Sequence, residues 1–222
     1  MVRIMIVPAR KIRPSKGRNY RSKISRSKSL RVIHAESLLE RDYVRLCNFD
    51  KMVEEIAFQP IGIKYNYKGR TRRYFPDYLL RTTDGRYFLV EVKLKKYADT
   101  DKNRAKFMAA EEHCRIKGWN FMVVTEDQVR PGYLQHNLTI LLGVKAHKEN
   151  TIVTEYILTL LNYLKQVKLG ELMARCNMID NSIFMVNVLK LIYTGRIIID
   201  LIRSKLSKES MLYFGDGTGG TE

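Results

Sequence analysis

The sequence predicts a mixed α/β fold, and three features support this prediction. Residues 76–93 contain two runs of strand-forming residues on either side of Asp84-Gly85, a strong hairpin signal. Apolar residues recur at helical spacing before this hairpin, in 37–49, and a further helical segment follows it, in 100–116. A second set of helical segments occupies the last third of the chain. We therefore expect a sheet flanked by helices, followed by a smaller domain.

Along the second strand of the hairpin, apolar and polar residues alternate. Glu91 and Lys93 lie on the face opposite to Phe88, Val90, Val92 and Leu94. Since an unpaired Glu or Lys is costly to bury, we expect their face to line a cleft or meet solvent. Asp77, at the far end of the first strand, can reach Glu91 by hairpin pairing. Two carboxylates can hold Mg²⁺ through oxygen, which indicates metal-assisted phosphodiester hydrolysis.

The length of the hairpin loop decides whether the two carboxylates meet. A two-residue loop, Asp84-Gly85, would place Asp77 opposite Val92 on the apolar face. A three-residue loop from Thr83 pairs Asp77 with Glu91, and Leu79 with Leu89. We predict the longer loop, with Gly85 in a left-handed, bulge-forming conformation. The alternative for this motif is an ordinary exposed hairpin, whose Glu and Lys form a surface ion pair.

The charge of the chain points to a polyanionic partner. The net charge of the 222 residues is +17, which favours binding to nucleic acid. Residues 1–31 contain eleven Lys or Arg and no Asp or Glu, whereas residues 151–222 contain eight basic and seven acidic residues. We expect 1–31 to be a basic, flexible DNA-binding arm, with a targeting or solubilising tail as the alternative. The predicted DNA-binding residues are Arg10, Lys11, Arg13, Lys16, Arg18, Arg21, Lys23, Arg26, Lys28, Lys95 and Lys96.

Other classes of protein fit the composition poorly. Three scattered cysteines, Cys47, Cys114 and Cys176, are too few for a disulfide framework and lack zinc-site spacing. The most apolar stretch, 183–202, contains charged residues, so we expect no membrane span. No secretory signal is recognisable, and a cytoplasmic location is expected.

Four motifs in order extend the argument beyond the hairpin. S-L-L-E-R-D-Y, F-Q-P, R-R-Y-F-P-D-Y-L-L and F-L-V-E-V-K together resemble the catalytic domain of the TnsA endonuclease family, which has a PD-(D/E)xK restriction-endonuclease-like core. The resemblance covers roughly residues 32–125. It implies that Glu40, Asp77 and Glu91 are catalytic metal ligands and that Lys93 positions or activates the attacking water. It also implies a metal contact from the backbone carbonyl of Val92. Gln59 is expected near the site, without an assigned role.

The resemblance also implies a reaction and partners. The chain would be the Mg²⁺-dependent endonuclease subunit of a bacterial heteromeric cut-and-paste transposase, with one or two ions and Mn²⁺ as a substitute. It would cut the 5′ ends of double-stranded transposon DNA, in a nucleoid-associated assembly. A TnsB-type transposase would cut and join the 3′ ends, and a TnsC-type ATPase would regulate both. Two alternatives remain: a stand-alone nuclease of resolvase or repair type, and a non-catalytic DNA-binding assembly factor.

The predicted domain organisation follows from the composition. A nuclease domain is expected at 32–140, a linker at 141–150 and a flexible tail at 215–222. Between them, 151–214 should hold three helices and a β-element, an order that resembles the winged-helix domain of TnsA-type proteins. The nearly neutral charge of this domain and the apolar helix at 182–193 favour protein contact over DNA binding.

Overall fold

The computed structural model describes residues 22–24 and 33–215, which divide into two compact units between Arg130 and Pro131. The first unit contains β1 (Ser22–Ile24), β2 (Ile33–Ala35), α1 (Leu38–Phe49), β3 (Val53–Phe58), β4 (Ile63–Tyr67), β5 (Arg70–Tyr74), β6 (Tyr78–Thr82), β7 (Tyr87–Val92), α2 (Lys95–Ala98), α3 (Asp101–Lys117), β8 (Asn120–Val124) and α4 (Glu126–Val129). The second contains α5 (Leu134–Gly143), α6 (Thr151–Leu164), β9 (Gln166–Lys168), α7 (Leu169–Arg175), α8 (Asn181–Tyr193), β10 (Ile197–Ile198) and β11 (Met211–Phe214). The predicted mixed α/β character is confirmed.

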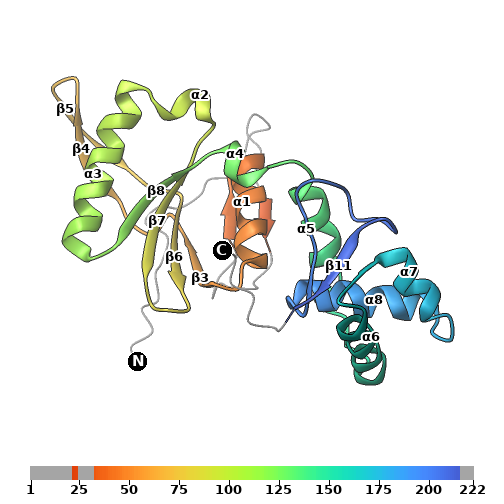
Figure 1. Ribbon diagram of the computed structural model, residues 1–222. Helices are drawn as coiled ribbons and strands as arrows, with labels where there is room; N and C mark the ends of the chain where they lie inside the picture. Colours follow the sequence, from red (N-terminus) through yellow and green to blue (C-terminus); the bar gives the residue numbers. More distant parts are fainter. Residues whose placement is uncertain (1–21, 25–32, 216–222) are drawn as a thin grey trace. The chain divides into compact units, whose positions relative to one another are not determined.

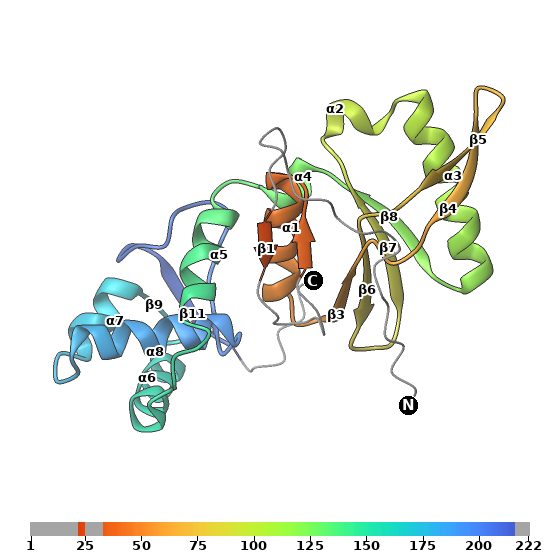
Figure 2. The same cartoon turned by 180° about the vertical axis from the view of Figure 1, so that it is seen from behind.

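A four-stranded sheet in the order β3-β6-β7-β8 forms the centre of the first unit (Figure 1). Strand β6 is antiparallel to both of its neighbours, and β8 is parallel to β7. Helix α1 covers one face, where Tyr43 and Val44 pack against Val90. Helix α3 covers the other face, where Ala110 packs with Leu89 (Figure 2). Helices therefore cover both faces of the sheet, consistent with a nuclease-like fold.

Strands β4 and β5 do not join this sheet. In the part of the chain described, β4 pairs only with β5, as a separate two-stranded ribbon. The chain is not extended throughout, because β5 ends at Tyr74 and β6 begins only at Tyr78. Pro76 lies in this break, and it lacks the N–H group that a continuous ladder needs.

The predicted three-residue hairpin loop is confirmed. Leu79 pairs with Leu89, so the same register places Asp77 opposite Glu91. The N–H of Thr82 donates to the carbonyl of Arg86 at 2.9 Å. Gly85 has φ +85°, the left-handed conformation that was expected.

The second unit packs four helices with a three-stranded sheet in the order β10-β11-β9. Helix α5 belongs to this unit, although residues 134–140 were assigned to the nuclease domain and 141–143 to the linker. The reason is Asn137, which is fully buried. Its amide donates to the carbonyls of Leu201 at 2.9 Å and Ser204 at 2.8 Å, and it accepts from the N–H of Leu206.

Two expectations on the ends of the chain fall largely outside the described residues. Of the arm at 1–31, only 22–24 is described, as a strand paired with β2. The side chains of Arg10, Lys11, Arg13, Lys16, Arg18, Arg21, Lys23, Arg26 and Lys28 are not described, and residues 216–222 of the tail lie outside as well. Within the described ranges, no helix is long and apolar enough to cross a membrane.

The conformation of Gly85 makes a testable prediction about stability. A Cβ in the left-handed region costs about 1–2 kcal/mol, so Gly85→Ala should lower the free energy of unfolding of the first unit by about this amount. Gly85→Asn is the matched control, since Asn tolerates this region better. Urea unfolding followed by Trp119 fluorescence reports on this unit, because Trp119 is the single tryptophan of the chain. Equal stability of the three proteins would contradict the assigned loop.

Candidate active site

Glu91 is buried between two partners, a hydroxyl and an ammonium, that each bind one of its oxygens. Its side chain lies on the α3 side of β7 and is only 2% exposed. Tyr74 donates its hydroxyl to Oε2 at 2.8 Å, and the ammonium of Lys93 lies 2.8 Å from Oε1. Of the two environments expected for this face, a cleft or solvent, direct exposure to solvent is not found at Glu91. The Glu–Lys pair exists, but its carboxylate is an interior group and the pair is not a surface one.

Asp77 is held beside Glu91 by backbone contacts on two neighbouring strands. Its Oδ2 accepts the N–H of Val92 at 2.8 Å, and its carbonyl accepts the N–H of Gln59 at 2.7 Å. Burial raises the pKa of Asp77 well above its usual range, and the negative charges of Glu91 and Glu40 raise it further. Gln59 is 2% exposed and has φ +41°. Its contact here is with the backbone of Asp77, which gives this residue a positioning role at the start of β6.

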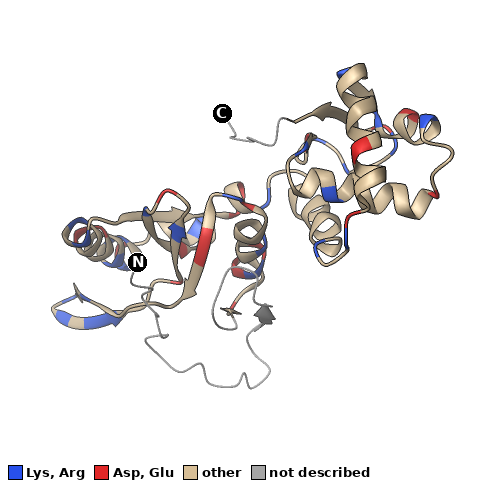
Figure 3. Ribbon diagram, turned by 90° about the horizontal axis from the view of Figure 1, so that it is seen from below, with Lys and Arg blue, Asp and Glu red and all other residues tan. Residues whose placement is uncertain are grey.

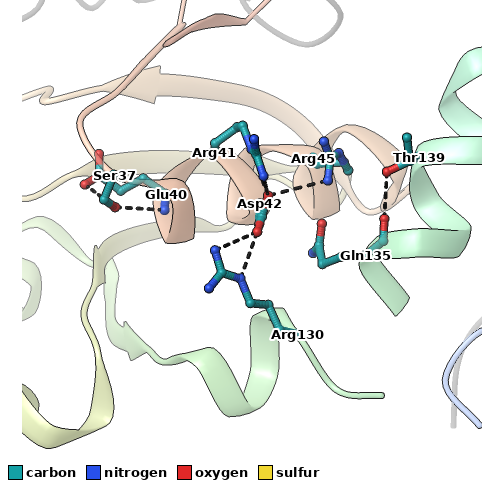
Figure 4. Close-up of polar contacts among 8 residues, drawn as sticks. All are labelled: Ser37, Glu40, Arg41, Asp42, Arg45, Arg130, Gln135 and Thr139. Carbon is teal, nitrogen blue, oxygen red and sulfur yellow. Dashed lines mark hydrogen bonds and ion pairs between the residues drawn. The ribbon is translucent and has the colours of Figure 1, made fainter. Parts of the chain in front are cut away.

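Glu40 lies in the first turn of α1 and is tied to the start of its own helix (Figure 4). Its Oε1 accepts the hydroxyl of Ser37 at 2.9 Å, and its Oε2 accepts the N–H of Glu36 at 2.8 Å. Burial raises the pKa of Glu40, although the positive charge of Lys93 acts in the opposite direction. The structure thus brings Glu40 within electrostatic reach of the site, while its oxygens cap the helix.

Lys93 is the cation of this cluster. Burial lowers its pKa, but the charges of Glu91, Asp77 and Glu40 outweigh burial and raise it. Its side chain is 28% exposed, so the ammonium lies between the interior carboxylates and solvent. Lys93 therefore stays protonated and offsets the repulsion among the three acids.

The donor set suits a hard cation, although it is not assembled as a cage. Among the described residues, no group of three or more His, Cys, Asp or Glu side chains is arranged to hold a metal ion. The contacts explain this, because Glu40 caps its helix and Glu91 is held by Tyr74 and Lys93. Mg²⁺ commonly uses only one or two carboxylates, with water and substrate phosphate completing its shell. Asp77 and Glu91, paired across two strands, meet that requirement.

Two residues at the site were missed by sequence reasoning. Tyr74 is 4% exposed and supports Glu91, but in the sequence it reads as an ordinary strand residue. Lys106, on α3, places its ammonium 5.3 Å from the centre of the Tyr74 ring. Burial lowers the pKa of Lys106, and the charge of Glu91 counteracts this. No local spacing in the sequence points to Lys106, because helix packing brings it there.

A buried ion cluster fixes the helix that carries Glu40. Asp42 is 4% exposed and accepts from Arg41 at 2.8 Å and from Arg130 at 2.7 Å (Figure 4). Arg130 follows α4, so this contact links α1 to the segment after the last strand of the sheet. We therefore assign Asp42 and Arg130 a structural role.

Lys95 and Lys96, which follow the hairpin and are predicted to bind DNA, have contacts within the protein. Lys95 forms an ion pair with Asp127 at 2.7 Å, with 71% of its side chain exposed. The ammonium of Lys96 lies 4.8 Å from the centre of the Tyr97 ring. A role for either in DNA binding stays a prediction.

The raised pKa of Asp77 predicts how stability depends on pH. An aspartate in the unfolded chain titrates near pH 3.9. Below about that pH, Asp77 is protonated in both the folded and the unfolded state, and its contribution to the stability of the fold is greatest. As pH rises through the higher pKa of the folded state, stability is lost. Asp77→Asn cannot ionise, so without divalent metal it should be more stable than the wild type at about pH 8, and the gap should narrow toward about pH 4.

Asp84→Asn is the control, because the pKa of Asp84 is lowered by the fold and its loss should change stability in the opposite direction. The hydrogen bond from Arg86 holds the pKa of the exposed Asp84 below its usual range, so this substitution should only weaken the unit at neutral pH. Urea unfolding at a series of pH values, followed by Trp119 fluorescence, measures both effects. If the free energy of unfolding depends on pH in Asp77→Asn as it does in the wild type, the raised pKa of Asp77 is not the source of that dependence.

Comparison with known proteins bears on the same region. Residues 50–126 match the protein-family model described as TnsA-like endonuclease N terminal. The match includes Asp77, Glu91 and Lys93, whereas Glu40 precedes it. A search of curated proteins finds no match. Together with the paired carboxylates, the match supports the assignment of this domain to a TnsA-type nuclease family.

Proposed function

We propose that this chain is a Mg²⁺-dependent DNA endonuclease and the 5′-end-cleaving subunit of a heteromeric cut-and-paste transposase. The observation that carries the proposal is the proximity of Asp77 to Glu91, whose charge raises the pKa of Asp77, with Lys93 in contact with Glu91, inside the matched TnsA-like region. Mn²⁺ would substitute for Mg²⁺. The substrate would be double-stranded DNA at the ends of a transposon.

In this proposal each residue has a defined task. Asp77 and Glu91 would hold the ion, and Glu40 and the backbone carbonyl of Val92 would be further ligands. When bound, Mg²⁺ supplies positive charge that polarises the scissile phosphate and makes a bound water more acidic. Lys93 would give up its contact with Glu91 to the ion. Its ammonium would then orient the attacking water and offset the negative charge that develops on the phosphate.

We propose that the second unit is a winged-helix-like domain that docks partner proteins. Its order of helix α6, strand β9, helices α7 and α8, and strands β10 and β11 supports the winged-helix description. The expected apolar surface on α8 is mostly covered, with Phe184 and Val188 buried. Among the helices of this unit, α6 carries the most exposed apolar side chains, with Ile152 84% and Tyr163 83% exposed, whereas Ile183 on α8 is 46% exposed. This surface would suit a TnsB-type transposase or a TnsC-type ATPase.

The proposal predicts that single substitutions abolish cleavage but not binding. Asp77→Ala, Glu91→Ala or Lys93→Ala should each slow Mg²⁺-dependent plasmid nicking by about 10²–10⁴-fold or more, because each removes a metal ligand or a positioned charge. DNA binding should persist. Glu111→Gln, an exposed carboxylate on α3, is the matched control and should cut normally. Nicking at the wild-type rate in any of the three variants would exclude that residue from the site.

The same assay, with and without partner proteins, separates the alternatives. A transposase subunit should require its partners for full activity. A stand-alone nuclease would nick equally well alone, and an assembly factor would bind DNA but never nick it.

Tyr74 supplies a finer prediction. Tyr74→Phe removes the hydroxyl that holds Glu91 and keeps the ring in the core. We expect a loss of nicking rate of about 10- to 100-fold at low Mg²⁺, because one net hydrogen bond to a charged group is worth about 1.5–3 kcal/mol. Raising Mg²⁺ should recover much of the rate if Tyr74 acts by positioning Glu91. A rate that is unchanged at every Mg²⁺ concentration would exclude this role.

A further inference from the structure

The β4–β5 ribbon is the most basic described segment outside the site. Residues 61–76 contain five basic residues and no acidic residue. The ribbon turns through Lys68 and Gly69, which both have positive φ, +52° and +68°. Such a two-residue turn matches the natural twist of a hairpin. The result is a narrow two-stranded element with its charge concentrated near the tip (Figure 3).

The charges of the ribbon are not used within the described protein. The five basic residues, Lys64, Lys68, Arg70, Arg72 and Arg73, are all exposed. None of them forms an ion pair with an acidic residue that the structure describes. Their contacts are with aromatic rings: Arg72 lies 5.8 Å from the ring centre of Tyr67, and Arg73 lies 5.6 Å from that of Phe75. Such contacts orient a guanidinium but leave its donors available.

The two faces of the ribbon differ in character. One face carries Ile63, Tyr65 and Tyr74, which pack with Ala110 of α3. The other face carries Lys64 opposite Arg73, and Asn66 opposite Thr71. The hydroxyl of Thr71 donates to Asn66 at 2.9 Å. The first face is thus anchored to the body of the unit and also carries Arg72, opposite Tyr65, and Arg70, opposite Tyr67. The second face presents Lys64 and Arg73, with the polar pair, to solvent.

The ribbon is joined directly to the candidate active site. Its last residue, Tyr74, donates to Glu91 at 2.8 Å, and Asp77 follows three residues later. At about 3.3 Å per residue, the basic residues of β5 lie within about 13 Å of Tyr74 along the strand. That span is less than half a turn of duplex DNA, which rises about 34 Å per turn.

We propose that the exposed face of the β4–β5 ribbon binds duplex DNA beside the cleaved bond, with Lys64 and Arg73 contacting phosphates. The inference rests on the proposed endonuclease function and adds a substrate-binding element to it. A two-stranded β-ribbon has dimensions that the major groove admits, and Arg and Lys donors suit the phosphates that flank it. Single-stranded nucleic acid fits less well, because proteins that bind it stack bases on aromatic rings. Here Tyr65 is 6% exposed and packs inward.

The test is the salt dependence of binding to a short fluorescent duplex, with Ca²⁺ in place of Mg²⁺. Each lost phosphate contact lowers the slope of log K against log salt by about 0.9. The double variant Lys64→Gln/Arg73→Gln should therefore lose up to about 1.8 from the slope. The matched control is Lys117→Gln/Lys148→Gln, which removes two exposed charges outside the ribbon. It should keep the wild-type slope, and unfolding followed by Trp119 fluorescence should be the same for all three proteins.

The outcomes separate this inference from the proposed function. Three results would each overturn the ribbon proposal, even if Mg²⁺-dependent nicking is observed. The slope could be unchanged in the ribbon variant, or the control could lose as much slope as the ribbon variant. The ribbon variant could also lose slope on single-stranded DNA but not on the duplex. A slope lowered only in the ribbon variant would support the ribbon as a duplex-binding element, even if the wild-type protein proves unable to nick. Failure of the wild-type protein to bind the duplex at low salt would overturn it as well.

Discussion

Asp77 and Glu91 carry like charges on adjacent strands inside the first unit, and much of the surrounding structure compensates for their repulsion. The N–H of Val92 binds one oxygen of Asp77, while Tyr74 and Lys93 bind both oxygens of Glu91. Burial and the neighbouring acids raise the pKa of Asp77. A protein that required only stability would gain from replacing such a pair with apolar residues. The loss of stability caused by the buried pair is explained if a cation binds between the two carboxylates during function.

The register of one hairpin determines whether this pair exists. A slip of one residue would move Asp77 to the opposite face, where Val90 packs against α1. The three-residue loop that ends in the left-handed Gly85 prevents that slip. Pro76 separates β5 from β6, so the basic ribbon ends at Tyr74, shortly before Asp77. The segment before Pro76 is therefore free to leave the sheet, while the segment after it aligns Asp77.

Local patterns were sufficient to predict part of this arrangement. The hairpin register followed from loop length and alternation, and α1 and α3 followed from length, composition and periodicity, with Ser37 and Gly118 at their observed caps. What local patterns could not give depends on packing between distant segments. The assignment of α5 to the second unit depends on buried hydrogen bonds of Asn137 to residues more than sixty positions away. The approach of Lys106 to Tyr74 is likewise set by the packing of α3 on the β4–β5 ribbon. The contacts of Glu40 with Ser37 and Glu36 are local, and the Ser-x-x-Glu spacing is typical of a helix start.

The most direct test of the central claim is a crystal structure of the protein with Mn²⁺, whose anomalous scattering identifies the ion. We predict an ion coordinated by carboxylate oxygens of both Asp77 and Glu91. We also predict that the ammonium of Lys93 leaves its 2.8 Å contact with Glu91. An ion bound elsewhere, with the Lys93–Glu91 contact intact at saturating Mn²⁺, would contradict the assignment of this pair as the metal site.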